Sequence, residues 1–91
     1  MPQVKLTTHL GKFFPDTHRI LQVDGSTIRE IVTQLNLQCP GLGDYLVTEQ
    51  DSLRQHVNIF VNGTMIKDRA TLQDVVAAES EIYIVQALSG G

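Results

Sequence analysis

A single stretch of the 91-residue sequence has the pattern of a full amphipathic helix, and this limits how any sheet in the protein can be covered. Thr27 followed three residues later by Glu30 is a capping box, which marks a helix start. Apolar residues then recur at helical spacing, at Ile28, Ile31, Val32 and Leu35. Pro40 and Gly41 end the element. Because one helix can cover only one face of a sheet, the sequence predicts an α+β fold.

Five segments have the two-residue alternation or apolar composition of strands, at residues 4–10, 18–23, 56–61, 64–67 and 81–87. The strongest ends at Asn62 and Gly63, a pair suited to a tight hairpin turn. Short helical turns are expected at 42–46 and 72–77, and a surface loop at 49–55. We expect a mixed sheet of about five strands in which the first and last strands lie side by side in the middle.

The size and composition of the chain favour one soluble domain without catalytic machinery of its own. With 91 residues, 42% of them hydrophobic and 19% charged, the chain can bury one modest core. The net charge is -3 and the basic residues are scattered along the chain, so the sequence does not predict a basic surface that would bind nucleic acid. The sequence has no run long and apolar enough to span a membrane, so we expect a cytoplasmic protein. Cys39, the only cysteine, is interpreted as a partly buried apolar residue.

Metal ligands and acid–base pairs are not predicted. The three histidines, His9, His18 and His56, have no spacing that forms a metal pair on a helix, and one cysteine gives no zinc motif. Asp68, Arg69 and Asp74 are interpreted as turn and cap residues. No nucleophile with a base and an orienting group can be nominated, which favours a binding or carrier role over an enzyme.

The last predicted strand passes directly into Leu88, Ser89, Gly90 and Gly91. We therefore expect a domain at residues 1–87 and a flexible diglycine tail at 88–91. Glycines lack a Cβ atom and make the slimmest peptide, so such a tail can enter a narrow channel and bring its own carboxylate to a reactive centre. The alternative is an idle, frayed terminus. The direct continuation from a strand favours the functional tail.

In its order of elements the chain resembles the ubiquitin-like β-grasp sulfur carriers. This family includes the small subunit of molybdopterin synthase, the thiamine-pathway carrier and the carrier of a cysteine-synthesis route. The resemblance is tightest at residues 53–63, LRQHVNIFVNG, and at residues 82–85, IYIV, with the Gly-Gly end. The first block and the length, with an insert around residues 41–55, are more similar to the cysteine-route and molybdopterin carriers than to the thiamine carriers. The sequence before the glycines, Ala87-Leu88-Ser89, differs from that of many relatives and leaves the pathway open.

The resemblance implies activation at the C-terminus. A ubiquitin-activating-type adenylyltransferase would use ATP and magnesium to form an acyl-adenylate on the Gly91 carboxylate, and a sulfur donor enzyme would displace AMP. The product would be a thiocarboxylate that delivers sulfur to a downstream synthase. Gly91 is then the reacting residue, while Gly90 and Ser89 give it access. The chain would be a protein co-substrate that binds no cofactor itself.

Strand alternation also predicts a partner-binding patch. It points Val57, Ile59 and Val61 inward with Ile82 and Ile84, and it points His56 and Asn58 outward. The predicted patch consists of Phe60, Tyr83, Val85, Ala87 and Leu88. Its aromatic residues could instead be half-buried under a loop, or the two faces could be reversed.

Two other functions use the same tail differently. A protein modifier would be joined through Gly91 to lysines of other proteins by an isopeptide bond, and it would need the same adenylation. A plain interaction domain would leave the tail idle.

Overall fold

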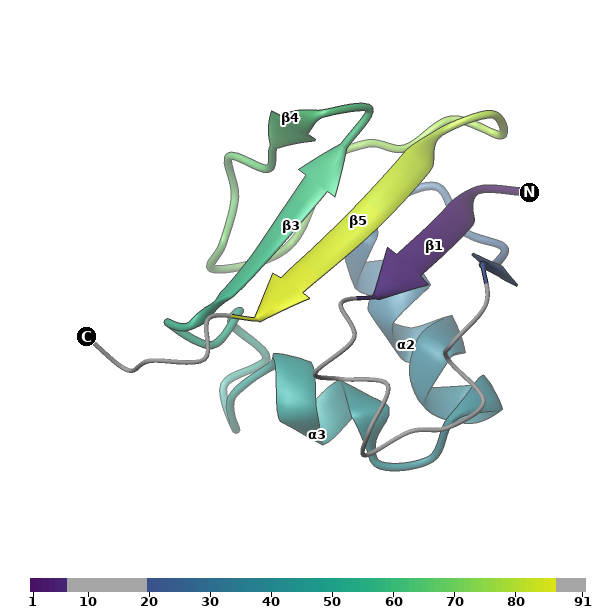
Figure 1. Ribbon diagram of the computed structural model, residues 1–91. Coiled ribbons are helices and arrows are strands. Elements are labelled where there is room, and N and C mark those ends of the chain that lie inside the picture. The colour runs from purple at the N-terminus through teal and green to yellow at the C-terminus, as the bar shows by residue number, and fades with distance from the viewer. Residues whose placement is uncertain (7–19, 87–91) are drawn as a thin grey trace.

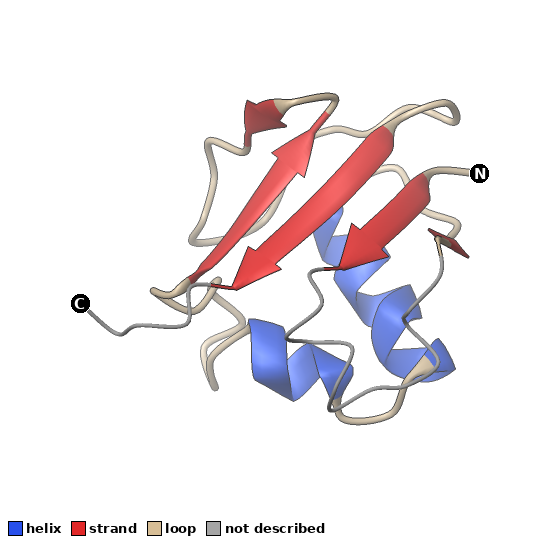
Figure 2. Cartoon of the chain, viewed as in Figure 1, coloured by secondary structure: helices blue, strands red, loops and turns tan. Residues whose placement is uncertain are grey.

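A mixed five-stranded sheet with the strand order β2-β1-β5-β3-β4 forms one layer of the protein, and two helices pack on one of its faces (Figures 1 and 2). The computed structural model describes residues 1–6 and 20–86. Its elements are β1 (Gln3–Leu6), β2 (Leu21–Gln22), α2 (Ile28–Gln38), α3 (Leu42–Leu46), β3 (Val57–Val61), β4 (Thr64–Met65) and β5 (Glu81–Gln86). The predicted α+β class is confirmed, and the predicted strand positions at 7–10, 18–19 and 87 lie outside the described residues. None of the described helices is long and apolar enough to cross a membrane.

The last strand lies in the middle of the sheet. β5 pairs with β1 in parallel, from Gln3 opposite Glu81 to Leu6 opposite Ile84. On its other side β5 pairs antiparallel with β3 along the whole of that strand (Figure 1). The prediction that the first and last strands are neighbours is therefore confirmed. The strand that leads to the C-terminus is held by backbone hydrogen bonds on both edges.

The core lies between the sheet and the helices, as the alternation predicts. Ile59 and Ile84 are fully buried on the sheet face that α2 covers, and Val57 and Ile82 lie beside them. All four residues of the predicted helix stripe are buried, and so are Leu42 and Leu46 of α3, which belong to the same core cluster. Cys39 is buried as expected. Val61 is only partly buried and packs against the edge of this core.

The start of α2 shows the predicted capping box in a shifted form. The Thr27 hydroxyl oxygen accepts a hydrogen bond from the Glu30 N–H at 3.3 Å. The Glu30 carboxylate accepts from the Ser26 N–H at 3.0 Å, one residue before the cap, and from the Ser26 hydroxyl. The bond to Thr27 satisfies an amide of the first turn that the helix itself leaves unpaired, and the bonds to Glu30 hold the residue before the cap.

The helical turn predicted at residues 72–77 is wrong. Leu72 has a positive φ of 58°, which a right-handed helix cannot contain. Val75 instead forms an antiparallel bridge with Thr27. The carbonyl oxygens of Leu72 and Asp74 accept from the N–H groups of Arg29 and Ile28, at 2.8 and 3.0 Å. This segment is therefore an extended chain whose backbone carbonyl groups cap the start of α2.

The hairpin between β3 and β4 has the predicted two-residue turn. Asn62 and Gly63 both have positive φ, 50° and 85°, as a type I′ turn requires. The turn sets Val61 opposite Thr64 and Phe60 opposite Met65. β4 is shorter than the predicted 64–67 and ends at Met65, and the next residue, Ile66, is buried. The predicted loop at 49–55 is also interrupted, since Leu53 is buried and bridges to Val47.

Candidate functional site

The site proposed from the sequence is built around the end of β5. Gln86 is the last residue of this strand and lies opposite Val57, the first residue of β3. The predicted reactive residue Gly91, the access residues Gly90 and Ser89, and the patch residues Ala87 and Leu88 lie outside the described residues. The structure therefore describes the part of the predicted site that lies before the tail, up to Gln86 at the end of β5.

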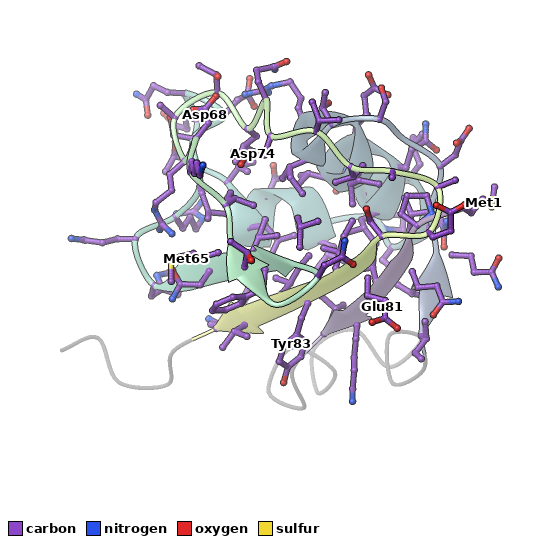
Figure 3. All side chains as sticks on the ribbon, turned by 90° about the horizontal axis from the view of Figure 1, so that it is seen from above. Met1, Met65, Asp68, Asp74, Glu81 and Tyr83 are labelled. Atoms are coloured by element: carbon purple, nitrogen blue, oxygen red, sulfur yellow. The ribbon has the colours of Figure 1, made fainter. Side chains whose placement is uncertain are left out.

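Three predicted patch residues share the sheet face opposite the helices. Phe60 lies directly opposite Tyr83 in the antiparallel register, and Val85 lies opposite Asn58. Tyr83 is 42% exposed and points away from the helices (Figure 3). Phe60 and Val85 are half-buried. The alternation therefore assigned the two faces of these strands correctly.

A further apolar residue extends this surface. Met65 of β4 is 46% exposed and pairs with Phe60. Sequence reasoning missed it, although the signal was present, because a two-residue Asn62-Gly63 turn fixes which residues pair across it. We call Phe60, Met65, Tyr83 and Val85 the outer patch. Lys5 of β1 pairs with Tyr83 on the other side and gives the outer patch a basic edge.

A hollow of about 300 Å³ lies at the end of β5. It is lined by Asp44 and Tyr45 of α3, by Arg54 and His56 from the segment before β3, and by Gln86. We call it the tail-base hollow. His56 was predicted to point outward with Phe60, but it precedes β3 and lines this hollow with residues of α3. Sequence reasoning did not find the hollow.

Hydrogen bonds hold the wall of the tail-base hollow in place. The Arg54 Nε donates to the Asp44 carbonyl oxygen at 3.0 Å and joins the segment before β3 to α3. The Arg69 guanidinium donates to the Arg54 carbonyl oxygen at 2.8 Å and to Asn58 Oδ1 at 2.9 Å. Arg69 lies in a turn, as interpreted from the sequence. Its half-buried side chain also fixes the segment that carries Arg54 and His56.

Asp68 and Asp74 act as turn and cap residues, as predicted. The Asp68 carboxylate accepts from the Thr71 hydroxyl and from the N–H groups of Thr71, Gln73 and Ala70. These bonds, the Thr71 hydroxyl first, lower the pKa of Asp68 to about 2. Asp74 accepts from the N–H groups of Lys67 and Asp68. Within residues 1–6 and 20–86 no three His, Cys, Asp or Glu side chains are grouped as metal ligands would be.

A mixed sheet with the last strand in the middle and a helix packed across one face define the protein as a ubiquitin-like β-grasp protein. The family model described as ThiS family matches residues 4–91. The chain therefore belongs to the ThiS family of small sulfur carriers and ubiquitin-like modifiers, whose members are carrier proteins and not catalysts. No curated protein matches the chain.

Solved structures with the same fold include carriers and modifiers. The Amycolatopsis orientalis BexX/CysO complex contains a chain with a TM-score of 0.86 and 23% identity, covering 100% of both chains. Mycobacterium tuberculosis CysO has a TM-score of 0.83 and 20% identity, covering 97% of this chain and 100% of that one. Small archaeal modifier protein 1 from Methanosarcina acetivorans has a TM-score of 0.80 and 25% identity, covering 99% and 95%.

Proposed function

We propose that the protein is a sulfur carrier whose Gly91 carboxylate is adenylated and then converted to a thiocarboxylate. The observation that carries this proposal is that the ThiS family match extends through residue 91 and so includes the diglycine end. The central position of β5 supports it, because a strand paired on both edges presents the following residues from a rigid base. The favoured destinations of the sulfur are molybdopterin or cysteine synthesis.

The activation proceeds in two steps. A ubiquitin-activating-type adenylyltransferase binds ATP and magnesium, and an oxygen of the Gly91 carboxylate attacks the α-phosphorus and releases pyrophosphate. Sulfide supplied by the donor enzyme then attacks the acyl carbon, the bond to AMP breaks, and the acyl carbon keeps the sulfur as a thiocarboxylate. The carboxylate needs this activation because its oxygen is a poor leaving group until it is joined to phosphate. The chain supplies the acyl group and the partners supply the catalytic residues.

The outer patch is the proposed contact for these partners. Apolar and aromatic side chains exposed together on a flat sheet face are typical of protein interfaces. Tyr83 and Val85 lie on the strand that precedes the tail, so an enzyme that covers them is also positioned to receive the residues beyond Gln86. A downstream synthase that accepts the sulfur would use the same surface in turn.

Intact-mass analysis tests the proposal. The protein is incubated with the cognate adenylyltransferase, ATP, magnesium and a sulfur source. We expect a mass gain of one sulfur-for-oxygen exchange, located at the C-terminus by fragmentation. A variant that lacks Gly90 and Gly91 is the control and should gain nothing. An unchanged C-terminus in the full chain would contradict the carrier function.

Protein modification is the second candidate, and it is favoured by the similarity to small archaeal modifier protein 1 at 25% identity. Both functions begin with adenylation at Gly91, so they separate only after that step. Conjugates on other proteins that disappear when Gly91 is deleted would favour the modifier. A thiocarboxylate that accumulates without conjugates would favour the carrier. An idle tail predicts that the deletion changes neither.

A further inference from the structure

Two side chains of opposite charge flank Tyr83 on the sheet face away from the helices. Lys5 of β1 lies beside Tyr83 in the parallel register, and Glu81 precedes Tyr83 by two residues on β5. Both charged residues are exposed, and Glu81 projects from the same side of the sheet as Tyr83 (Figure 3). Together with Ile20, which is 54% exposed, these residues line a groove of about 350 Å³ that is continuous with the outer patch at Tyr83.

Neither charge is paired within the described part of the chain. Among residues 1–6 and 20–86 the one ion pair joins Arg29 of α2 to Asp51. The hydrogen bonds between Glu81 and Asn62 use the backbone N–H and carbonyl of Glu81 and leave its carboxylate unused. The face therefore presents a cation and an anion at two fixed places. An occupant that neutralises both must carry the two opposite charges at matching positions.

The sheet register places four side chains around Tyr83 in the pattern of a cross. Neighbouring strands are about 4.8 Å apart, and residues two apart on one strand are separated by about 6.8 Å. Lys5 and Phe60 lie one strand to either side of Tyr83. Glu81 and Val85 lie two residues before and after it on β5. Two adjacent arms of the cross are thus charged with opposite sign, and the other two arms are apolar.

This cross is complementary to itself. Two copies that meet face to face are related by a two-fold axis that lies between their sheets and passes over Tyr83. An axis along the strands sets Lys5 against Phe60, and an axis across the strands sets Glu81 against Val85. One diagonal axis sets Lys5 against Val85 and Glu81 against Phe60.

The other diagonal axis matches every arm of the cross. It sets Lys5 against Glu81 and Phe60 against Val85, each pair twice, and Tyr83 against its own copy. The strands of the two sheets then cross at nearly a right angle, which is one of the two common ways in which sheets pack face to face. The charge pattern of the face thus favours a second copy of the same chain as its occupant.

We propose that the outer face of the sheet binds a second copy of this chain in a weak symmetric dimer. Lys5 of each copy pairs with Glu81 of the other, on both sides of a central pair of offset Tyr83 rings. The contact involves the three strands β1, β5 and β3 of a protein whose largest dimension is 31 Å, so it is small. Small interfaces are typical of transient complexes, and the dimer is therefore in exchange with the monomer.

The dimer has a consequence for activation, and this consequence rests on the proposed function. Dimerisation covers Phe60, Tyr83 and Val85, which are the residues proposed to contact the adenylyltransferase. Self-association and activation therefore compete for one face, and only the monomer presents it to the enzyme. The dimer itself does not depend on the proposed function, because the chain forms it without any enzyme.

Sedimentation equilibrium of the full chain at low ionic strength tests the inference, with concentrations up to about 1 mM to detect a weak dimer. We expect a monomer–dimer equilibrium in the wild type. Lys5→Glu and Glu81→Lys each place like charges at both contacts and should raise Kd about tenfold or more. The double variant Lys5→Glu with Glu81→Lys restores both pairs in reverse and should return Kd to the wild-type value. Glu49→Lys reverses a charge at an exposed position outside the groove and should leave Kd unchanged.

A mixture of the two single variants sharpens the test. One copy with Lys5→Glu and one with Glu81→Lys carry opposite charges at both contacts, so the mixture should associate more tightly than either variant alone. Circular dichroism should give all variants the thermal midpoint of the wild type, because both positions are exposed. A double variant or a mixture that associates no better than the single variants would overturn the inference.

The outcomes also separate this inference from the proposed function. If the wild type stays monomeric over the whole concentration range, the inference fails, whatever happens at the C-terminus. If the wild type dimerises as described and intact-mass analysis finds no sulfur-for-oxygen exchange, the proposed function fails and the dimer stands.

Discussion

Phe60 on β3 lies directly opposite Tyr83 on the central strand β5, and the two rings share the sheet face away from the helices. Their neighbours along each strand, Ile59 and Ile84, point the other way and are fully buried. The proposed recognition surface and the core are therefore formed by alternate residues of the same two strands. A substitution on one face can change partner binding while the other face keeps the fold.

Phe60→Asp should weaken adenylation and leave the protein folded. It places a carboxylate in the centre of the outer patch, and loss of an apolar anchor at an interface costs about 2 kcal/mol, or roughly 30-fold in KM. The measurement is pyrophosphate exchange with varied carrier, alongside circular dichroism. Leu37→Asp, at a 69% exposed position of α2, is the matched control and should have little effect. Normal adenylation of Phe60→Asp would remove the outer patch from the proposed function.

Ile84→Ala should destabilise the fold strongly. Ile84 is fully buried between Leu6 of β1 and Ile59 of β3, and truncation of a buried isoleucine costs about 2–5 kcal/mol. Urea unfolding followed by circular dichroism gives the free energy of unfolding. Leu37→Ala is the comparison and should change that free energy by less than about 0.5 kcal/mol. Similar values for both variants would show that Ile84 is not in the core.

Gly63→Ala should destabilise the β3–β4 hairpin through its backbone alone. Gly63 has a φ of 85°, and a Cβ added there would meet no atom within 4 Å. Left-handed backbone costs an alanine about 1 kcal/mol, whereas asparagine adopts it more readily. We expect the thermal midpoint to fall for Gly63→Ala and to fall less for Gly63→Asn. Equal midpoints for the two variants would argue against the type I′ turn.

The Asp68 carboxylate should make stability depend on acid pH. Its pKa is lowered from 3.8 to about 2 by the hydrogen bond from the Thr71 hydroxyl and by backbone N–H groups. A carboxyl group with a lowered folded-state pKa stabilises the fold fully above its unfolded pKa, and this contribution is lost as the pH falls from 3.8 towards 2. The free energy of unfolding is measured from pH 7 to pH 2 for the wild type and Asp68→Asn. The difference between them should be largest near neutral pH and shrink below pH 4, and a constant difference would contradict this assignment.

The features of the fold that are determined by residues close together in the sequence were predicted correctly. The Thr27 cap, the buried stripe of α2 and the Asn62-Gly63 turn each follow from residues within a few positions of one another. The outer patch also follows, because alternation and turn register are local rules. Met65 was missed, although the two-residue Asn62-Gly63 turn would have predicted that it pairs with Phe60.

The errors come from contacts between distant segments. The apolar residues at 72–77 suggest a helical turn, but the backbone there is held by hydrogen bonds to the start of α2, more than 40 residues earlier in the sequence. The tail-base hollow likewise combines α3, the segment before β3 and the end of β5. Nothing in the local sequence at Gln86 indicates that this residue lines a hollow together with Asp44 and Tyr45.

The central position of β5 also has a mechanical meaning. Any force that a partner applies to residues beyond Gln86 acts first on a strand that is bonded to β1 on one edge and to β3 on the other. A pull along this strand loads both ladders in shear, so many hydrogen bonds must break together rather than one after another. Under the proposed function, in which one enzyme after another would act on the last residues, this arrangement lets the domain stay folded while its chain end is pulled.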